Sequence, residues 1–466
     1  MKYGYYTVLF LYNGIKKNRG NHMKLNNKRT FIVGLAFLSI CAFWQMYDNV
    51  IPLILTNTFN LNETYSGAIM AADNILALIL LPLFGSLSDK TNTKIGKRMP
   101  YILFGTGLAI ILMNILPILD NGYFASPSNG KLVGFVVVLG LLLIAMGTYR
   151  SPAVALMPDV TPKPLRSKAN AIINLMGAVG GIIYLAIAAF SYPNSRTQGL
   201  AHVDYQILFV FVSAIMFIAI GLLYLIIKEP ELVEENKKLE AEHPEWNLAK
   251  EDESGNEALP SDVKRSLGFL LASIALWFIG YNGVTTWFTT YVSVVMGQGL
   301  GGASTCLLVA TAGAIISYIP IGNLASRIGR RKTIMGGIIL LSLMFFLGFI
   351  ETNVFKNINF LMYVSFALVG LAWAAINVNS LPMVVEMCKG SDIGKFTGYY
   401  YTASMAAQIV TPILAGTLMR LISYKILFIY SAFFVLLSFV TMTQVRHGDQ
   451  KVEAKKGLEA FENMED

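Results

Sequence analysis

Twelve long apolar runs constrain this chain more than any other feature of its sequence. A helix needs about twenty mainly apolar residues to cross a bilayer core about 30 Å thick. Because every backbone polar group inside lipid must be hydrogen-bonded within its own element, we expect such runs to be helices. The sequence therefore predicts an all-α polytopic membrane protein with twelve transmembrane helices. The runs lie approximately at residues 30–56, 64–88, 99–118, 132–157, 167–190, 204–227, 266–293, 302–325, 333–351, 358–386, 394–419 and 425–444.

The distribution of basic residues predicts how these helices are oriented. With the N-terminus in the cytoplasm, the inner segments hold 30 of the 36 Lys and Arg residues and the outer loops hold 5. Positive residues collect in the short cytoplasmic loops of membrane proteins, so both termini are expected inside the cell. We interpret the net charge of +8 as a topology signal and not as a surface that binds nucleic acid.

Two sequence patterns recur at about half the chain length, which predicts an internal repeat. A basic, glycine-containing turn at 85–98 returns 237 positions later at 322–332. The fourth and tenth runs each place a proline shortly before an acid at the inner end, with Pro152 and Pro382 230 positions apart. Two six-helix halves inserted in the same orientation are parallel repeats. Their substrate site is expected at the interface between them, near the membrane midplane.

The polar stretch between the sixth and seventh runs is expected to be a cytoplasmic linker, because it is rich in charge and interrupted by proline. The expected organisation is therefore a cytoplasmic N-terminal segment at 1–29, a first six-helix half at 30–227, the linker at 228–265, a second six-helix half at 266–444 and a cytoplasmic tail at 445–466.

The first 22 residues leave two interpretations open. The pair Arg19-Gly20 shortly before Met23 is what in-frame translation of a purine-rich ribosome-binding site would produce. On that interpretation residues 1–22 are not translated and the protein begins at Met23. Alternatively, residues 5–12 form a short segment that lies on the membrane surface, because they are too few to span it.

The basic turns resemble the loop signature of the major facilitator superfamily, in which glycine and an acid precede basic, glycine and basic residues. The first turn carries three extra residues between Lys90 and Gly96. That long form is similar to the sucrose-transporter and glycoside–pentoside–hexuronide cation symporter branch, which the stretches 152–171 and 277–282 also resemble. The superfamily resemblance covers residues 30–445. It implies two parallel six-helix repeats and transport by alternating access, and the branch implies a sugar or glycoside substrate.

The same resemblance implies that the basic turns control a cytoplasmic gate. The acid Asp89 would lie against the end of a neighbouring helix, which favours an opposite charge by about 0.3–1 kcal/mol, while Lys97 and Arg98 reach acidic partners. Ser326 stands where the second turn should have an acid, so the second latch is expected to be weaker. The alternative is that the basic residues only enforce topology. The set expected to act in gating is Asp89, Lys97, Arg98, Asp159, Arg166, Arg327, Arg330, Arg331 and Glu386.

Acids inside the spans are candidates for coupling to an ion, because an intramembrane charge is costly unless it pairs or faces water. Asp48 and Asp73 both lie roughly 10–15 Å below the outer surface at about 1.5 Å per residue, so they could share one cavity. Two close carboxylates raise one another's proton affinity and can bind H⁺ near neutral pH. With amide oxygens such as that of Asn74 they could hold Na⁺ instead. The structural alternative for each acid is a hydrogen bond to a neighbouring helix.

Arg150 is the only cation deep in a span. An unpaired arginine there is unfavourable, so we expect it to meet Asp48, Asp73, Glu386 or a substrate oxygen. The resemblance adds that plant-type sucrose carriers place an arginine one helical turn later, where this chain has Val154. Residues four apart lie on the same helix face, which favours a role for Arg150 in sugar binding or as a counter-ion.

Aromatic rings in the spans stand close to amide and charged side chains, a combination suited to a polyhydroxylated substrate. Aromatic faces stack on the C–H groups of sugars, while amides and carboxylates bind hydroxyl groups. The alternative is the ordinary enrichment of Trp and Tyr at membrane interfaces. The candidate substrate-binding residues are Trp44, Gln45, Tyr47, Asp48, Asn49, Tyr149, Arg150, Trp277, Tyr281, Asn282, Trp373, Asn377 and Asn379.

Sequence motifs for other chemistries are missing. The three cysteines lie in or at the ends of the runs, which gives neither a disulfide framework nor a metal cluster. None of the four histidines lies within a run, and no phosphate-cradling loop or nucleophile motif occurs. We therefore expect no enzyme activity, no cofactor and no metal.

These observations predict a secondary active transporter in the plasma membrane of a prokaryote, which imports a sugar or glycoside with H⁺ or Na⁺. The expected partners are the small-molecule substrate, the coupling ion and the lipid bilayer, and the chain is expected to be a monomer. One alternative is a proton-driven exporter of drugs or metabolites, whose cavity would be more apolar. A more remote one is a non-transporting receptor or a polytopic enzyme, against which the repeated turns and the missing catalytic motifs argue.

Overall fold

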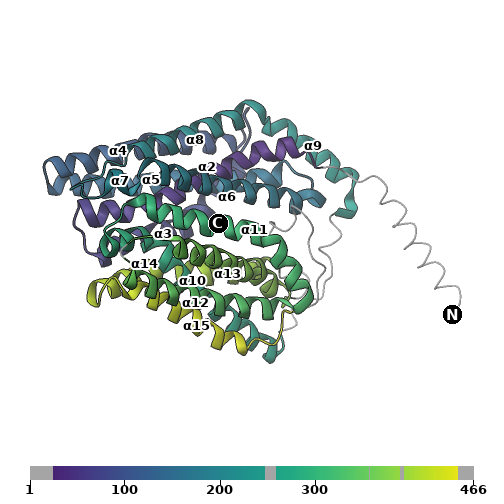
Figure 1. Cartoon of the computed structure of the whole chain (residues 1–466). Coiled ribbons are helices and arrows are strands. Elements are labelled where there is room, and N and C mark those ends of the chain that lie inside the picture. The colour runs from purple at the N-terminus through teal and green to yellow at the C-terminus, as the bar shows by residue number, and fades with distance from the viewer. Residues whose placement is uncertain (1–24, 247–258, 356, 389–392, 450–466) are drawn as a thin grey trace, which may run out of the picture.

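The computed structural model describes residues 25–246, 259–355, 357–388 and 393–449. The described residues form helices joined by short connections, and they contain no strands. Figure 1 shows the purple-to-teal helices of the first half beside the green-to-yellow helices of the second. The two interpretations of residues 1–22 lie outside the described residues, as does most of the tail at 445–466.

Twelve described helices are long and apolar enough to cross a membrane, which confirms the predicted number. The first six and their short neighbours are α2 (Asn27–Leu53) with its π-helical extension η2 (Ile54–Thr58), α3 (Glu63–Lys90), α4 (Met99–Ala125), α5 (Asn129–Asp159), η3 (Lys163–Leu165), α6 (Arg166–Ser191), α7 (Asn194–Thr197) and α8 (Gln206–Ile226). The rest of the chain forms α9 (Glu229–Glu242), η4 (Pro244–Trp246), α10 (Ser261–Met296), α11 (Leu300–Ile328), α12 (Arg330–Val354), α13 (Phe360–Val385), α14 (Ile393–Leu421) and α15 (Ile426–Thr443).

The helices pack as two bundles, which we call the first bundle (α2 to α8) and the second bundle (α10 to α15). In the first, α2 packs on α6 and α4 packs on α5; in the second, α11 packs on α13 and α10 on α15. The bundles are joined mainly by three helix pairs, namely α3 with α14, α6 with α11, and α2 with α10, and α11 also contacts α2 and α7. In Figure 1, α3 accordingly lies among the helices of the second half, beside α14.

The two ends of the helices define two faces. We call the end that carries α9 the linker face; it also carries the connections at 91–98 and 160–165 and Gly329. We call the opposite end the far face; it carries the connections at 59–62, 126–128, 192–205, 297–299 and 422–425, with residues 355 and 357–359.

Helix boundaries follow local sequence signals. Asn62 ends the connection before α3, and its side chain accepts a hydrogen bond from the Tyr65 N–H at 3.0 Å. Asn359 similarly accepts from the N–H groups of Leu361 and Met362 at the start of α13. Such caps satisfy N–H groups that lack a partner within the helix. The helix α10 starts at Ser261, five residues before the apolar run predicted to begin at 266. The apolar run begins later than the helix because the first turn of the helix is polar.

Candidate functional site

A cavity of about 300 Å³ lies between the two bundles. Residues from α2, α3, α5 and α6 of the first bundle and from α10, α11, α13 and α14 of the second form its wall. Eleven residues predicted from the sequence to bind substrate or ion line this one cavity: Trp44, Gln45, Asp48, Asn49, Asp73, Asn74, Arg150, Tyr281, Asn282, Trp373 and Asn377.

The charged groups of the cavity all come from the first bundle. Asp48 lies on α2, Asp73 on α3 and Arg150 on α5. The Asp73 carboxylate accepts hydrogen bonds from the backbone N–H and the side-chain amide of Asn74, at 2.5 and 2.7 Å. The guanidinium carbon of Arg150 lies 5.7 Å from the centre of the Trp44 ring, within the range of a cation–π interaction.

The second bundle supplies aromatic and amide groups to the same cavity. The rings of Tyr281 and Trp373 stack with a centroid separation of 3.7 Å and an interplanar angle of 3°. Phe278 meets the Trp373 ring edge-on at 5.3 Å. Mutual stacking holds these rings in place without polar contacts, which forms a rigid aromatic wall beside Asn282 and Asn377.

Several polar atoms in the cavity wall are buried and have no hydrogen-bond partner among the described residues. They are the indole N–H of Trp44, the side-chain oxygen of Asn49, the amide nitrogen of Asn282 and both polar atoms of the Asn377 amide. Leaving a buried polar group unpaired costs about 1–3 kcal/mol. A ligand that offers both donors and acceptors would therefore gain affinity at this site.

Four residues predicted to bind substrate do not line the cavity. The hydroxyl of Tyr149 bonds to Ser39 and to the carbonyl of Ala36, and Trp277 is wholly buried. The other two are Tyr47, which is 1% exposed, and Asn379, whose amide donates to the Ala375 carbonyl of its own helix at 2.9 Å.

Four polar residues of the cavity wall were not predicted from the sequence, namely Thr285, Thr311, Tyr318 and Gln408. An amide in the middle of an apolar run, such as Gln408, carries the same signal that marked Asn377, because polar side chains in a span usually face a partner or a cavity. The two threonines carry no such signal, since a threonine hydroxyl can bond to its own helix. Thr311 does so, donating to the Leu307 carbonyl at 2.9 Å.

On the linker face, Arg98 is the centre of a cluster in the first bundle. Its guanidinium pairs with Asp89, donates to Asp159 at 2.8 Å and to the Ser88 hydroxyl at 2.5 Å. Lys97 lies 3.1 Å from the same Asp159. Arg98 is only 4% exposed, so these partners offset the cost of burying its charge.

The acid Glu229, at the start of α9, completes this cluster and was not predicted. Its carboxylate accepts from the backbone N–H groups of Lys97, Arg98 and Met99 at 2.8–2.9 Å. It therefore caps α4 from about 130 positions away, and a carboxylate at a helix N-terminus is stabilising. Gly96 has a φ of +112°, and a Cβ there would lie 2.2 Å from the Glu229 carboxylate, so this close approach requires glycine.

The second bundle repeats the arrangement with different residues. Arg330 pairs with Glu386, and the Asp449 carboxylate accepts from the Arg330 N–H at 2.6 Å. Asp449 thus caps α12 as Glu229 caps α4, and Gly329 has a φ of +94° beside it.

The remaining predicted gating residues surround these clusters. Ser326, at the position expected to hold an acid, donates to the Asn323 carbonyl. Arg331 donates to the Thr443 carbonyl at 2.9 Å, and Arg327 lies in the last turn of α11. Arg166 bonds to Glu240 of α9 at 3.2 Å. Each of the ion pairs described here joins residues of one bundle, or a bundle and its attached helix α9, and none of them connects the two bundles.

We expect the variant Glu229→Gln to lower the free energy of unfolding by about 1–2 kcal/mol, because a charged cap on the first turn of α4 becomes a neutral one. The measurement is the thermal unfolding midpoint of the purified protein in detergent. The matched control is Glu231→Gln, which changes an exposed acid of the same helix paired with Lys228. Equal midpoints for the two variants would contradict a capping role.

The two bundles meet closely at the far face. A Cβ added to Gly67 of α3 would lie 2.2 Å from the Pro412 carbonyl oxygen of α14. A Cβ added to Gly416 of α14 would lie 2.4 Å from the Glu63 carbonyl oxygen of α3. Separations below 3.0 Å are not tolerated, so these two glycines allow the backbones of α3 and α14 to touch.

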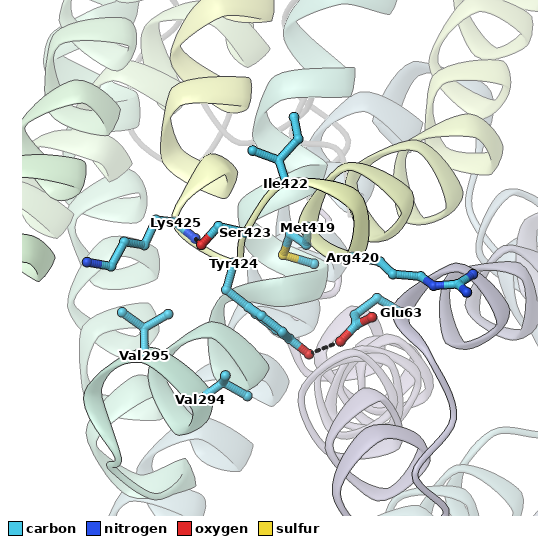
Figure 2. Close-up of a pocket in the computed structure, with 9 residues that line it drawn as sticks. All are labelled: Glu63, Val294, Val295, Met419, Arg420, Ile422, Ser423, Tyr424 and Lys425. Carbon is cyan, nitrogen blue, oxygen red and sulfur yellow. Dashed lines mark hydrogen bonds between the residues drawn. The ribbon is translucent and has the colours of Figure 1, made fainter.

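Hydrogen bonds cross between the bundles at the same face. Figure 2 shows Tyr424 pointing at Glu63 across a second pocket of about 500 Å³, with a hydroxyl-to-carboxylate distance of 2.5 Å. Burial, with a further contribution from Glu63, raises the pKa of Tyr424, so this phenol remains a donor. Arg420 and Lys425 also line the pocket, but Figure 2 shows their charged ends pointing in opposite directions.

Further hydrogen bonds join the two bundles at the far face. They are Thr417 to Thr64, Asn57 to Ser293, Asn194 to Gln298, and the Gly301 N–H to the Tyr192 carbonyl.

The sequence of this chain matches one family model, described as the Major Facilitator Superfamily, over residues 33–317 and 300–462. Among curated proteins it is similar to the sucrose transport protein SUC3 of Arabidopsis thaliana, with 30% identity over 146 residues, 28% of this chain and 24% of that protein. It is also similar to the alpha-ketoglutarate permease of Escherichia coli (strain K12), with 28% identity over 177 residues, 37% of each chain. These matches span only about a quarter to about a third of the relatives' length.

Solved structures are similar over nearly the whole chain. The D-xylose-proton symporter aligns with a TM-score of 0.64 at 13% identity, covering 90% of this chain and 98% of that one. The xylose transporter XylE from E. coli, in an inward open conformation, gives a TM-score of 0.64 at 14% identity over 91% of this chain and 97% of that one. At this level of identity the likeness shows the fold alone, and it confirms the predicted fold class.

Proposed function

The chain belongs to the major facilitator superfamily, a family of membrane transporters and not of enzymes, and we propose that it imports a sugar or glycoside together with H⁺ or Na⁺. The observation that carries this proposal is the set of buried, unpaired polar atoms in the cavity wall, contributed by Trp44, Asn49, Asn282 and Asn377. Sugar hydroxyl groups both donate and accept hydrogen bonds, so one neutral ligand can satisfy donors and acceptors together.

The aromatic wall supports the same substrate class. The stacked rings of Tyr281 and Trp373 line the same cavity as the unpaired amides. A sugar ring has C–H faces that pack on aromatic rings and an equator of hydroxyl groups that bind amides. Specificity in such sites comes from a few placed polar groups in a mainly apolar lining.

The charges of the first bundle support coupling to a cation. Asp48 and Asp73 line one cavity with a single guanidinium, that of Arg150. A coupling ion that neutralises one carboxylate changes the relative stability of the two transport states, because a ligand shifts such an equilibrium only through differential affinity. We assign Asp48, Asp73 and Asn74 to the coupling site. Arg150 either binds the substrate or acts as the counter-ion of a carboxylate.

Alternating access requires the two bundles to open at one face while they close at the other. We propose that the bundles are the transport domains, with the division 30–227 and 266–444 and the linker 228–265 between them. We place the linker face and both termini in the cytoplasm of a prokaryotic cell, with the protein acting as a monomer in the plasma membrane. The far face is then the outer gate, and its contacts between α3 and α14 support an inward-facing state.

Two other substrate classes fit less well. A dicarboxylate, as the name of the E. coli permease relative suggests, would meet one arginine and two acids in this cavity. A lipophilic drug would leave the amides of Asn282 and Asn377 unpaired, and that argues against an exporter.

The experiment is uptake of labelled sugars and glycosides by proteoliposomes under an imposed proton or sodium gradient, with alpha-ketoglutarate and lipophilic cations as competing classes. We expect concentrative uptake of at least one sugar or glycoside that collapses when the gradient is removed. Uptake of the dicarboxylate alone, or gradient-driven efflux of the cations with no sugar uptake, would refute the proposal.

A matched pair of variants tests whether the cavity amides bind that sugar. Asn377→Leu removes the unpaired amide of the cavity, and we expect a rise in the apparent KM of about 5- to 150-fold, which corresponds to about 1–3 kcal/mol. Asn379→Leu removes an amide of the same helix that bonds to its own backbone, and we expect less than a threefold change (about 0.6 kcal/mol). Equal effects would show that the cavity amide is not a sugar contact.

A further inference from the structure

Asp120 is a fully buried carboxyl group that the proposed transport cycle does not use. It lies near the end of α4, close to the far face, and is 0% exposed. Neither of its oxygens has a hydrogen-bond partner within 3.5 Å among the described residues, although the Thr58 hydroxyl is a polar neighbour, and the group is not part of the central cavity wall. An ionised carboxylate buried without partners is strongly unfavourable, so such a group holds a proton or lies beside a group that does.

The imidazole of His202 lies beside this carboxyl group. Its Nε2 is 3.8 Å from Asp120 and 2.7 Å from the side-chain oxygen of Asn121. An amide oxygen only accepts hydrogen bonds, so Nε2 carries a hydrogen and donates it to Asn121. Nδ1 lies 3.4 Å from the Thr58 hydroxyl. Burial lowers the pKa of His202, an effect that Asp204 partly opposes, so the imidazole is neutral at neutral pH and can take up a second hydrogen in acid.

The pair can exchange protons with the medium on the far face. The His202 side chain is 12% exposed, whereas that of Asp120 is 0% exposed, so the imidazole forms the route from the surface to the carboxyl group. Its ring stacks on Phe124 at 4.5 Å, which holds it in place. The other titratable neighbours are Asp204, Tyr192 and Tyr205; burial raises the pKa of both phenols, so they stay neutral.

Both bundles have a buried acid at the equivalent position of the repeat, and in the first bundle a histidine lies beside it. Glu351 of α12 stands 231 positions after Asp120, close to the repeat offset, and is 1% exposed. One of its oxygens accepts from the Ser365 hydroxyl at 2.8 Å, and Cys306 is its titratable neighbour on α11. The second bundle therefore keeps a buried acid at this level with a hydroxyl partner, and the first bundle has an imidazole there.

We propose that Asp120 and His202 form a proton-binding site on the far face, separate from the central cavity. The site adjoins a contact between the bundles. Thr58, the partner of His202, ends η2, and the preceding residue Asn57 donates to Ser293 of α10 at 3.3 Å. A π-helical turn at this position often marks a functional site. A proton bound at the pair changes the hydrogen bonding of η2 and hence the contact with α10.

The test is potentiometric titration of the purified full-length protein in weakly buffered detergent between about pH 5 and about pH 8, the range in which an imidazole and its neighbours titrate. Asp120→Asn keeps the shape of the side chain and cannot titrate, and we expect this variant to bind one proton fewer than the wild type over that range. His202→Gln keeps polar atoms near Asn121 and Thr58, and we expect it to shift the midpoint of the Asp120 step, because neighbouring sites titrate as a coupled pair.

The matched control is His447→Gln, which removes an imidazole on the linker face that lies 3.3 Å from the exposed acid Asp262. We expect it to leave the Asp120 step in place. Superimposed curves for the wild type and Asp120→Asn would overturn the proposal, and so would an Asp120 step that His202→Gln leaves unshifted. If Asp120→Asn does not fold, His202→Gln still decides. A coupled site predicts that this variant shifts a second step beyond the loss of its own imidazole step, and loss of one step with every other step unshifted would overturn the proposal. The titration needs no substrate, so its result is independent of whether the chain carries sugars.

Discussion

A valine in place of Gly67 is expected to shift this protein from a state closed at the far face to one open there. Even a Cβ at this position would lie 2.2 Å from the Pro412 carbonyl oxygen, and a backbone atom cannot move aside as a flexible side chain can. Forcing extra atoms into a packed contact costs about 1–3 kcal/mol, which would change the ratio of the two states by about 5- to 150-fold. Gly416→Val is expected to act in the same direction through the Glu63 carbonyl.

The measurement is labelling of a cysteine introduced at Thr285, which lines the central cavity, with a membrane-impermeant thiol reagent added to one side of oriented proteoliposomes. The native cysteines are replaced by serine. Labelling through the far face should rise in Gly67→Val, and labelling through the linker face should fall. The matched control is Gly398→Val on α14, where no heavy atom lies within 4 Å of an added Cβ. If Gly67→Val labels like this control, α3 and α14 do not form the outer gate.

Loss of the charge at Asp73 is expected to abolish concentrative uptake and to leave exchange of substrate across the membrane intact. An asparagine keeps the size of the side chain but neither takes up a proton nor supplies a negative charge to Na⁺. One charge moved through 100 mV supplies about 2.3 kcal/mol, or about 50-fold accumulation, and Asp73→Asn should reduce that ratio to about one. Exchange needs no net ion movement, so its rate should change by less than about threefold, or about 0.6 kcal/mol.

The measurement combines gradient-driven uptake with counterflow in the same proteoliposomes. Asp262→Asn is the control, because it removes an exposed acid on the linker face, far from the cavity wall. Undiminished accumulation by Asp73→Asn would remove this residue from the coupling site. Loss of both uptake and counterflow would show that it binds substrate instead. In either case Asp48, which lines the same cavity, becomes the coupling candidate.

Part of the candidate site could be predicted from the sequence, because polar residues are rare inside membrane spans and therefore stand out. Asp48, Asp73 and Arg150 stand out in apolar runs, and each lines the central cavity. The prediction could not tell the face of a helix on which an aromatic residue lies. Tyr149, next to Arg150 in sequence, points away from the cavity and bonds to Ser39, because neighbouring residues on a helix point in different directions.

The gating clusters were also only partly predictable, because some of their contacts join residues that are far apart in the sequence. The family resemblance implied acidic partners for Arg98, and in the structure these partners are Asp89 and Asp159. The capping acids Glu229 and Asp449 carry no local signal, because each is separated from its helix start by more than 100 positions. Only the folded chain brings them to the N-termini of α4 and α12.

The sequence by itself determined the number of membrane spans, the repeat and the chemical character of the central site. These follow from local requirements. A helix needs about twenty apolar residues to span a bilayer, and a charge inside a span must pair with another group or face water. The tertiary structure alone decided which amides face the cavity unpaired, which glycines let the two bundles close at the far face, and that Asp120 lies beside His202. Those are contacts between helices, and they depend on how helices rotate and approach one another, which the polarity of one helix does not encode.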